Sequence, residues 1–220
     1  RYEIQPFMQE VLGFDRFKGK KLLEIGCGLG TDLLQFARGG ARVTGIDLTP
    51  QGIDLAKKRF AMENQSADLR VADAEHLPFD DGTFDVVFSF GVLHHTPNTQ
   101  RAVDEAFRVL KPDGEIIMML YHKYSLHVWA GTPMYRLFSK KRNRSLSLSE
   151  DWVRIYDGEV NPLGKAYSKA KVRSMFDRFT SLKFIIRDPV RRRFPQSINW
   201  LNQTLFSRWL GFYLIIRGRK

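Results

Sequence analysis

The chain has 220 residues, of which 43% are hydrophobic, so it is long enough to bury the core of one ordinary domain. Its one cysteine, Cys27, excludes an internal disulfide, and no apolar run approaches the roughly 20 residues that a membrane span needs. No Cys/His cluster has the spacing of a zinc site, and the N-terminus lacks the pattern of a signal peptide, so we expect a metal-free cytoplasmic protein.

The net charge of +11 is unevenly distributed along the chain. Residues 1–120 carry 14 Lys and Arg against 18 Asp and Glu, a net charge of −4, whereas residues 121–220 carry 21 against 6, a net charge of +15. A positive field attracts anions, so we expect the second half of the chain to contact an anionic small molecule, a membrane surface or nucleic acid. The alternative is a solvated basic face that binds nothing.

Short β-rich runs alternate with helical patterns from about residue 20 to residue 121, which predicts a parallel sheet flanked by helices. Continuous apolar runs such as Val86–Phe88 indicate strands that are covered on both faces. Pro112-Asp113-Gly114 predicts a turn that ends the third helix. The helices are predicted to start at Thr31 or Asp32, at Thr49-Pro50 and at Thr96-Pro97. The predicted strands are Lys21–Cys27, Arg42–Asp47, Asp68–Asp73, Phe84–Phe90 and Glu115–Tyr121.

After Tyr121 this alternation breaks, and residues 123–167 are expected to form an insertion over the functional edge of the sheet. Five of its aromatic residues are candidates for a wall that contacts an acceptor molecule, the alternative being the insertion's own small core; they are Trp129, Tyr135, Trp152, Tyr156 and Tyr167. The elements that follow are predicted as a helix at Ser168–Phe179, a strand at Leu182–Arg187, a helical stretch near Ile198–Trp209 and a last strand at Phe212–Arg217. We therefore expect a single domain with an N-terminal arm (1–19), a binding core (20–122), an insertion or lid (123–167) and C-terminal elements (168–220).

The basic segment Arg191–Arg193 precedes apolar residues at helical spacing, namely Ile198, Leu201, Leu205 and Trp209. This combination is typical of an element that lies on a membrane surface. The alternative is a helix that faces the core and leads into the last strand.

A glycine-rich turn follows the first predicted strand and directly precedes a helix. Gly26, Gly28 and Gly30 allow a ligand to approach the backbone, and the helix N-terminus supplies unpaired N–H groups, although Gly30 can instead serve tight helix packing.

Asp47 ends the second strand, where a carboxylate can receive both hydroxyls of a ribose. Glu24 is unfavourable beside a pyrophosphate but suits a cationic amino group. The pattern favours a cofactor with an amino-acid end over a dinucleotide.

The end of the third strand offers groups that suit adenine. Asp73 can accept a hydrogen bond from the exocyclic amine, and the N–H of Ala74 lies beside it in sequence. The apolar candidates for the faces of the ring are Leu48 and Phe90. The remaining expected cofactor contacts are Cys27, Glu75 and, from the N-terminal arm, Tyr2.

Taken in order, these motifs resemble those of class I S-adenosylmethionine-dependent methyltransferases, in the group of the ubiquinone/menaquinone methylases. The resemblance covers about residues 20–121 and departs only at Pro112-Asp113-Gly114, where Pro-Gly-Gly is usual. It implies a seven-stranded, mostly parallel Rossmann-like sheet with helices on both faces, an antiparallel last strand and S-adenosylmethionine across the carboxyl ends of the strands. The motifs are Glu24–Gly30, Asp47, Asp73-Ala74, Phe84–Val87, His94-His95 and Arg108–Gly114.

Methyl transfer from a sulfonium is an in-line displacement, so placing the acceptor and excluding water can supply most of the catalysis. Our first candidate for a catalytic base is His95, which lies at a strand end next to Thr96, and the second is Tyr121, at the end of the fifth strand. In the alternative interpretation one of His94 and His95 packs or caps the helix at Pro97, and the other only lines the cleft. An Asn-Pro-Pro-aromatic tetrad, which grips planar amines in related families, is absent from the sequence, so nucleic acid is disfavoured as a substrate.

We therefore expect methyl transfer to a small-molecule acceptor that is anionic or associated with a membrane, with peripheral membrane contact through the basic half. An S-adenosylmethionine-binding module without catalysis and an RNA methyltransferase are the alternatives.

Overall fold

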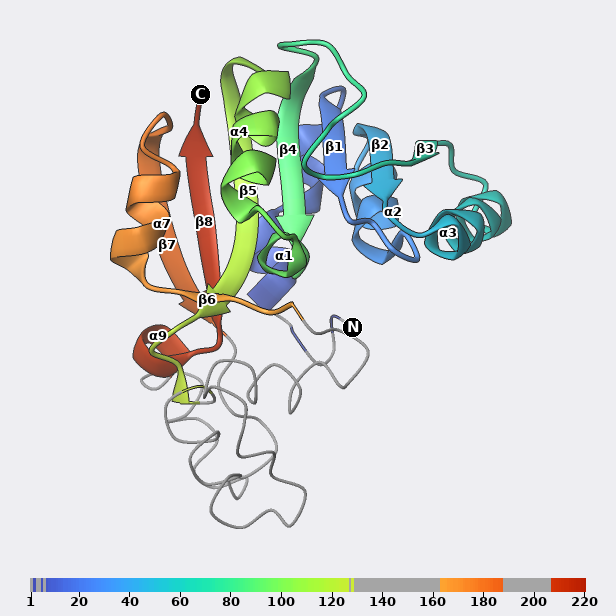
Figure 1. The fold of residues 1–220 in the computed structure, drawn as a ribbon. Helices are drawn as coiled ribbons and strands as arrows, with labels where there is room; N and C mark the ends of the chain where they lie inside the picture. The colour runs from blue at the N-terminus through green and yellow to red at the C-terminus, as the bar shows by residue number, and fades with distance from the viewer. Residues whose placement is uncertain (1, 3–4, 6, 127, 129–162, 188–206) are drawn as a thin grey trace, which may run out of the picture.

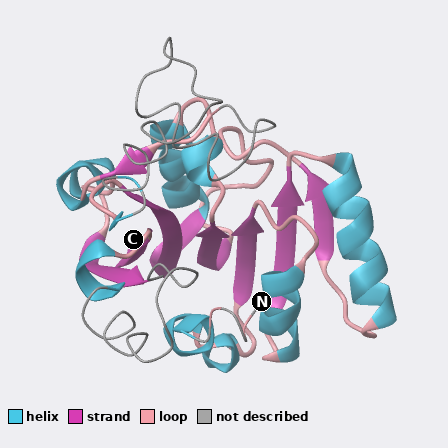
Figure 2. Cartoon of the chain, turned by 90° about the horizontal axis from the view of Figure 1, so that it is seen from below, coloured by secondary structure: helices cyan, strands magenta, loops and turns pink. Residues whose placement is uncertain are grey.

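The computed structural model describes residues 2, 5, 7–126, 128, 163–187 and 207–220. One mixed sheet lies at its centre, with helices on both faces (Figures 1 and 2). Seven strands follow the order β3-β2-β1-β4-β5-β8-β7, and the short strand β6 pairs with β5. The strands are β1 (Lys21–Ile25), β2 (Arg42–Asp47), β3 (Asp68–Val71), β4 (Phe84–Phe90), β5 (Leu110–His122), β6 (Ala166–Tyr167), β7 (Thr180–Arg187) and β8 (Tyr213–Arg219).

The direction of the strands matches the expected Rossmann-like fold. Strand β1 pairs in parallel with β2 and β4, β2 with β3, and β4 with β5. The C-terminal strand β8 runs antiparallel to both of its neighbours, β5 and β7. The predicted fold class, including the antiparallel last strand, is therefore confirmed. Strand β6 adds to the predicted set; its two residues are too few to show any periodicity in the sequence.

Helix starts follow local capping chemistry. Thr49 caps α3 as predicted, because its hydroxyl accepts the N–H of Gly52 at 3.3 Å. The predicted start of α4 at Thr96-Pro97 is wrong: Asn98 is the cap, and the Thr96 hydroxyl instead donates to the Leu93 carbonyl at 2.9 Å. The helices are α1 (Phe7–Leu12), η1 (Phe14–Phe17), α2 (Thr31–Arg38), α3 (Pro50–Met62), η2 (Leu93–His95), α4 (Thr99–Val109), α7 (Lys169–Met175) and α9 (Ser207–Leu210).

The predicted turn at Pro112–Gly114 also needs correction. Helix α4 ends at Val109 without it, and β5 already begins at Leu110, which pairs with Phe84. The residues that follow leave the ladder, because Asp113 has a φ of 61° and the register shifts before the strand resumes. The segment is an irregularity inside a long strand, with the conformation of a bulge.

Two apolar cores lie on the two faces of the sheet. On one face α1, α2 and α3 pack around Phe36 and Phe88, whose ring centroids are 5.1 Å apart. On the other face α4 and α7 pack against the sheet through Val109 and Phe176. Coverage on both sides explains why the central strands are almost continuously apolar.

The carboxyl ends of the parallel strands meet at the lower edge in Figure 1, where β6 also lies. The predicted site residues of the core lie at this edge, at the carboxyl ends of β1, β2, β4 and β5 and in the turns after β1, β2, β3 and β4. Within the described residues no helix is both long and apolar enough to cross a membrane. Several residues of the predicted insertion and basic segment lie outside the described part of the chain: Trp129, Tyr135, Trp152, Tyr156, Arg191–Arg193, Ile198, Leu201 and Leu205.

Candidate cofactor and acceptor site

The turn between β1 and α2 brings its backbone to an open surface. The carbonyl of Cys27 accepts the N–H of Gly30 at 2.8 Å, which closes a tight turn, and the three glycines have φ values of 76°, 49° and 70°. A Cβ at Gly26 would lie 2.3 Å from the side chain of Val92, whereas a Cβ at Gly28 would have nothing within 4 Å. Gly26 is therefore required by packing, and the backbone at Gly28 is open to the approach of a ligand.

Gly30 has a different surrounding. A Cβ there would lie 3.3 Å from the Cβ of Ala56 and 3.2 Å from the ring of Phe60, both on α3. This close packing is the alternative role that the sequence left open for Gly30. A direct contact of Gly30 with cofactor stays a prediction.

Asp47 links the glycine turn to the start of α3. One carboxylate oxygen accepts the N–H of Gly28 at 2.9 Å, and the other accepts the N–H and the hydroxyl of Thr49 at 2.9 and 2.6 Å. The neighbouring Leu48 leaves 71% of its surface exposed. A carboxylate fixed from two sides, beside open backbone and an exposed apolar side chain, suits a ribose with its base.

Glu24 lies in β1 just before the glycine turn, and Cys27 lies within the turn. Glu24 is only 4% exposed, and a buried carboxylate is well matched to a cationic amino group. Burial, and after it the charges of Glu24 and Asp47, raise the pKa of the Cys27 thiol, so Cys27 stays protonated at neutral pH. The Cys27 N–H donates to Ile46 and its carbonyl accepts from Gly30, so both of its backbone groups are already used. A cofactor contact of Cys27 stays a prediction.

The turn after β3 holds the candidate adenine contacts. The Asp73 side chain is 50% exposed, and one of its oxygens accepts the N–H of Glu75 at 2.9 Å. The N–H of Ala74 has no acceptor among the described residues, which leaves it available to a ring nitrogen. The Glu75 carboxylate accepts the N–H of Asn98 at 2.6 Å, so this residue ties the turn to the start of α4. Its predicted role in cofactor binding stays untested beside that structural one.

Two further predicted contacts come from the N-terminal arm and from the end of β4. The Tyr2 hydroxyl donates to the Asp32 carboxylate at 2.6 Å, which places the N-terminal arm at the first turn of α2. Phe90 ends β4 half-buried, with its ring 5.4 Å from that of Tyr213. Both residues lie near the strand ends, and their contacts with cofactor stay predictions.

The acceptor side is a column of aromatic rings. The His94 ring lies 4.1 Å from the ring of His95 and 3.6 Å from that of Tyr121, which stacks on Phe212 at 4.3 Å. His94 is fully buried, and neither ring nitrogen has a hydrogen-bond partner in the described part of the chain. Burial, and after it the charge of His95, hold the His94 pKa well below its usual range, so its ring is neutral.

His95 differs from its neighbour because it is half-buried and hydrogen-bonded. Its Nδ1 lies 2.5 Å from the carbonyl oxygen of Leu163, and since a carbonyl can only accept, Nδ1 carries the proton. In the neutral ring the lone pair is therefore on Nε2. The structure thus brings His95 and Tyr121, the two predicted catalytic residues, into one cluster with the buried His94 between them, whereas their catalytic roles stay predictions.

Sequence reasoning missed two residues of this site, Leu163 and Lys165. The Lys165 ammonium donates to the carbonyls of Thr96 and Pro97 at 2.9 and 2.6 Å, directly after the two histidines. Nothing in the sequence signals these contacts, because they join segments 68 and 69 residues apart. Thr49 was predicted as a helix start, and the Asp-Leu-Thr-Pro spacing could also have indicated its bonds to Asp47.

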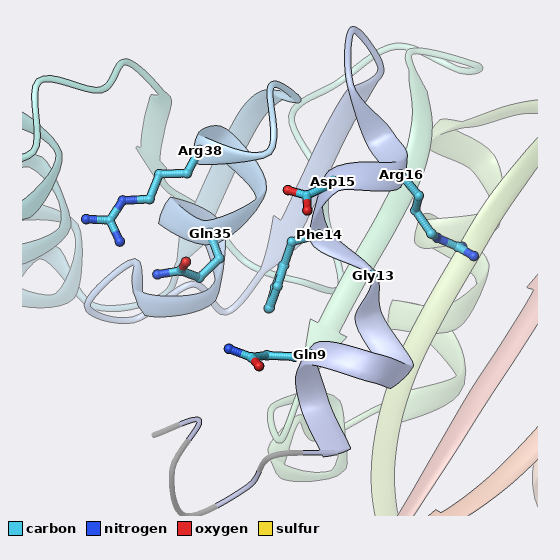
Figure 3. A pocket seen from close by; sticks show the side chains of 7 residues that line it. All are labelled: Gln9, Gly13, Phe14, Asp15, Arg16, Gln35 and Arg38. Carbon is cyan, nitrogen blue, oxygen red and sulfur yellow. The ribbon is translucent and has the colours of Figure 1, made fainter.

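Two surface hollows lie away from this edge. One of about 570 Å³ lies between α1, η1 and the last turns of α2, and its lining includes Gln9, Phe14, Asp15 and Gln35 (Figure 3). The other, of about 530 Å³, is lined by residues at the amino ends of β1, β2 and β3, among them Lys21, Arg42 and Asp68. Neither contains a predicted cofactor or catalytic residue, so neither belongs to the site built above.

Comparison with known proteins agrees with this architecture. Residues 23–118 match the family model of a methyltransferase domain. The chain is 37% identical over 98 residues to sterol 4-C-methyltransferase strm-1 of Caenorhabditis elegans, an alignment that covers 44% of this chain and 29% of the nematode protein. It is 27% identical over 183 residues to the ubiquinone biosynthesis O-methyltransferase of Bartonella tribocorum, covering 75% of this chain and 74% of that protein.

A solved structure of an S-adenosylmethionine-dependent methyltransferase from Methanosarcina mazei has the same fold, with a TM-score of 0.65 at 19% identity over 96% of both chains. The chain spans less than two thirds of the nematode relative's length, whereas it covers nearly all of the archaeal structure. The strand order and the glycine turn beside Asp47 agree with the family match. Over residues 23–118 the chain is therefore similar to a methyltransferase domain, and its sheet has the strand order of class I S-adenosylmethionine-dependent methyltransferases, whose cofactor is S-adenosylmethionine.

Proposed function

We propose that this chain transfers a methyl group from S-adenosylmethionine to a small-molecule acceptor that binds beside His95 and Tyr121. The observation that carries the proposal is the convergence of two features at one sheet edge. The first is the open backbone of Gly28 held against Asp47, and the second is the ring cluster that contains His95. When bound, the cofactor supplies an electrophilic methyl group on a sulfonium.

The chain's own groups supply binding and orientation. Asp47 is fixed by Gly28 and Thr49, so its oxygens can receive ribose hydroxyls without reorganising. Asp73 and the Ala74 N–H together match the amine and ring nitrogen of adenine. Glu24 lies in the buried part of the same edge, where a carboxylate favours a cationic amino group.

The acceptor side provides an apolar wall and one base. The buried rings of His94, Tyr121 and Phe212 pack against one another beside His95 and exclude water from that side of the site. Nε2 of His95 carries the lone pair of the neutral ring, so it can accept the proton of an acceptor hydroxyl as the new bond forms. The two relatives are named for a sterol and for ubiquinone biosynthesis, which supports an acceptor of the same apolar class.

The charge of the second half supports an anionic acceptor or one that is reached from a membrane surface. Its described residues contain 12 Lys and Arg, with Asp177 as the one acidic residue among them. Trp209 and Tyr124 are 76% and 56% exposed. Exposed Trp and Tyr favour the membrane–water interface, and basic residues are attracted to anionic lipids. We infer peripheral contact with such a surface through this half.

The direct test is release of S-adenosylhomocysteine in the presence of pooled quinones, phenols, sterols, carboxylic acids and amines. We expect release that depends on one pool and that falls in Asp47→Ala when S-adenosylmethionine is not saturating. Binding of S-adenosylmethionine without turnover on any pool would instead support a non-catalytic binding module. Turnover on transfer or ribosomal RNA fragments, with steeply salt-dependent binding, would support the RNA alternative.

A further inference from the structure

Residues 163–167 run along the turn that contains the two histidines and bind it at every second position. The Leu163 carbonyl contacts His95 Nδ1 at 2.5 Å, and the Lys165 N–H donates to the His94 carbonyl at 3.1 Å. The Tyr167 hydroxyl donates to Thr99 at 2.9 Å. Successive residues of an extended chain face opposite sides, so this alternation turns one side of the segment toward residues 93–99. We call residues 163–167 the strap.

The strap is anchored on its other side by the sheet. Its last two residues form β6, where Ala166 pairs with Tyr121 and Tyr167 with His122. The strap therefore joins the end of β5 to the turn after β4 at the acceptor side of the site. The sheet and the hydrogen bonds of Lys165 and Tyr167 determine the position of the strap, so the Leu163 carbonyl is held in a fixed position relative to His95.

Lys165 makes the most extensive contact within the strap. Its ammonium donates to the carbonyls of Thr96 and Pro97 at 2.9 and 2.6 Å, in addition to its backbone bond with His94. Bonds from a charged donor are stronger than those between neutral groups. The three contacts hold the turn against the strap on both sides of His95.

We propose that Lys165 is a positioning residue for His95, a role that rests on the proposed methyl transfer. By holding residues 94–97 against the strap, it keeps the Leu163 carbonyl on Nδ1, which fixes the tautomer whose lone pair is on Nε2. A histidine that loses this acceptor can exchange between its two neutral tautomers, and only one of them presents the basic nitrogen to the acceptor. Lys165 thus acts on catalysis through another residue, without touching the reacting atoms.

The first test reads the tautomer directly and needs neither cofactor nor acceptor. In the full chain labelled with ¹⁵N-histidine, long-range ¹H–¹⁵N spectra at a pH where the ring is neutral should show His95 with Nδ1 protonated and Nε2 unprotonated. Lys165→Met should move both nitrogen shifts toward averaged values, whereas Lys165→Arg should keep the parent pattern because a guanidinium can donate to the same carbonyls. Lys171→Met, on the exposed side of α7, removes the same charge and should change nothing.

A parent protein with the proton on Nε2 of His95 would overturn the proposal, and so would an unchanged tautomer in Lys165→Met. Both outcomes are independent of turnover, so they are distinguishable from a failure of the proposed methyl transfer. If the strap separates from residues 93–99 in the Lys165→Met variant, the spectra of the parent protein and of Lys165→Arg still decide whether His95 has the stated tautomer.

The second test uses kinetics once an acceptor is known. Lys165→Met should lower kcat about tenfold, a part of what a positioned base contributes, with little change in cofactor affinity. In a His95→Ala background the same substitution should have no further effect, because the two residues act as one unit. Equal losses in both backgrounds would show that Lys165 acts independently of His95 and would contradict the proposal.

Discussion

Substitution of Asp47 tests the cofactor site most sharply, because this carboxylate connects three donors. In Asp47→Ala the N–H of Gly28 and both donors of Thr49 lose their acceptor. A typical hydrogen bond contributes roughly 1 kcal/mol net, so we expect the free energy of unfolding to fall by about 1–3 kcal/mol. For a chain of this length that corresponds to a fall in Tm of roughly 2–12 °C. The fold should survive this loss.

The cofactor affinity should fall by a further, separable amount. Losing a polar partner of the ribose costs about 1–3 kcal/mol, which is roughly a 5- to 150-fold rise in Kd for S-adenosylmethionine by calorimetry. Asp54→Ala is the matched control, since Asp54 is an exposed carboxylate on α3, one turn from the cap. Unchanged affinity in a folded Asp47→Ala protein would refute the placement of the ribose at this carboxylate.

Four further outcomes are expected. Asp73→Ala should weaken S-adenosylmethionine binding by about 1–3 kcal/mol in calorimetry while the Tm hardly changes, because the half-exposed carboxylate makes few contacts of its own; equal affinity would move adenine elsewhere. His95→Ala should lower kcat with little change in cofactor affinity, and parent-like turnover would mean that catalysis rests on positioning alone. Arg108 lowers the pKa of Glu105, so this carboxylate stabilises the fold above its unfolded pKa of about 4.5, and its contribution disappears as the pH falls through the lower folded pKa. The difference in Tm between the parent protein and Glu105→Gln should therefore shrink as the pH is lowered over that range. A difference that stays constant would contradict this prediction. Raising the salt concentration should increase the KM for the acceptor and leave the affinity for the cofactor nearly unchanged, and neutralising Arg191–Arg193 should reproduce part of that increase. If the acceptor KM stays constant in both experiments, the basic half is a solvated surface.

Much of the cofactor half could be predicted because its signals are local. Strands β2 and β4 have their predicted bounds. Strand β4 is almost wholly buried, and such a parallel strand leaves a nearly continuous apolar run in the sequence. Thr49 caps α3 where the Thr-Pro pair indicated it. The start of α4 was missed because Thr96 has the right chemistry for a cap but bonds back to Leu93 within η2, which leaves Asn98 to cap the helix.

The acceptor half was predicted less well because its contacts are distant in sequence. Leu163 and Lys165 meet the His94–Pro97 turn across 68 to 71 residues, and neither residue type suggests such a contact. Strand β6 forms only because β5 offers it an edge to pair with. The histidine pair was recognised by its place after a strand, whereas the burial of His94 and the tautomer of His95 depend on residues that the local pattern does not contain.

The most direct test of the account is a titration of the ¹⁵N-labelled chain with S-adenosylmethionine, followed through the backbone amides. We expect shifts concentrated at Gly28, Leu48 and Ala74, at the carboxyl edge of β1, β2 and β3. Shifts concentrated instead at Gly13, Asp15 and Gln35, around the hollow of Figure 3, would contradict it and place the cofactor at the other end of α2.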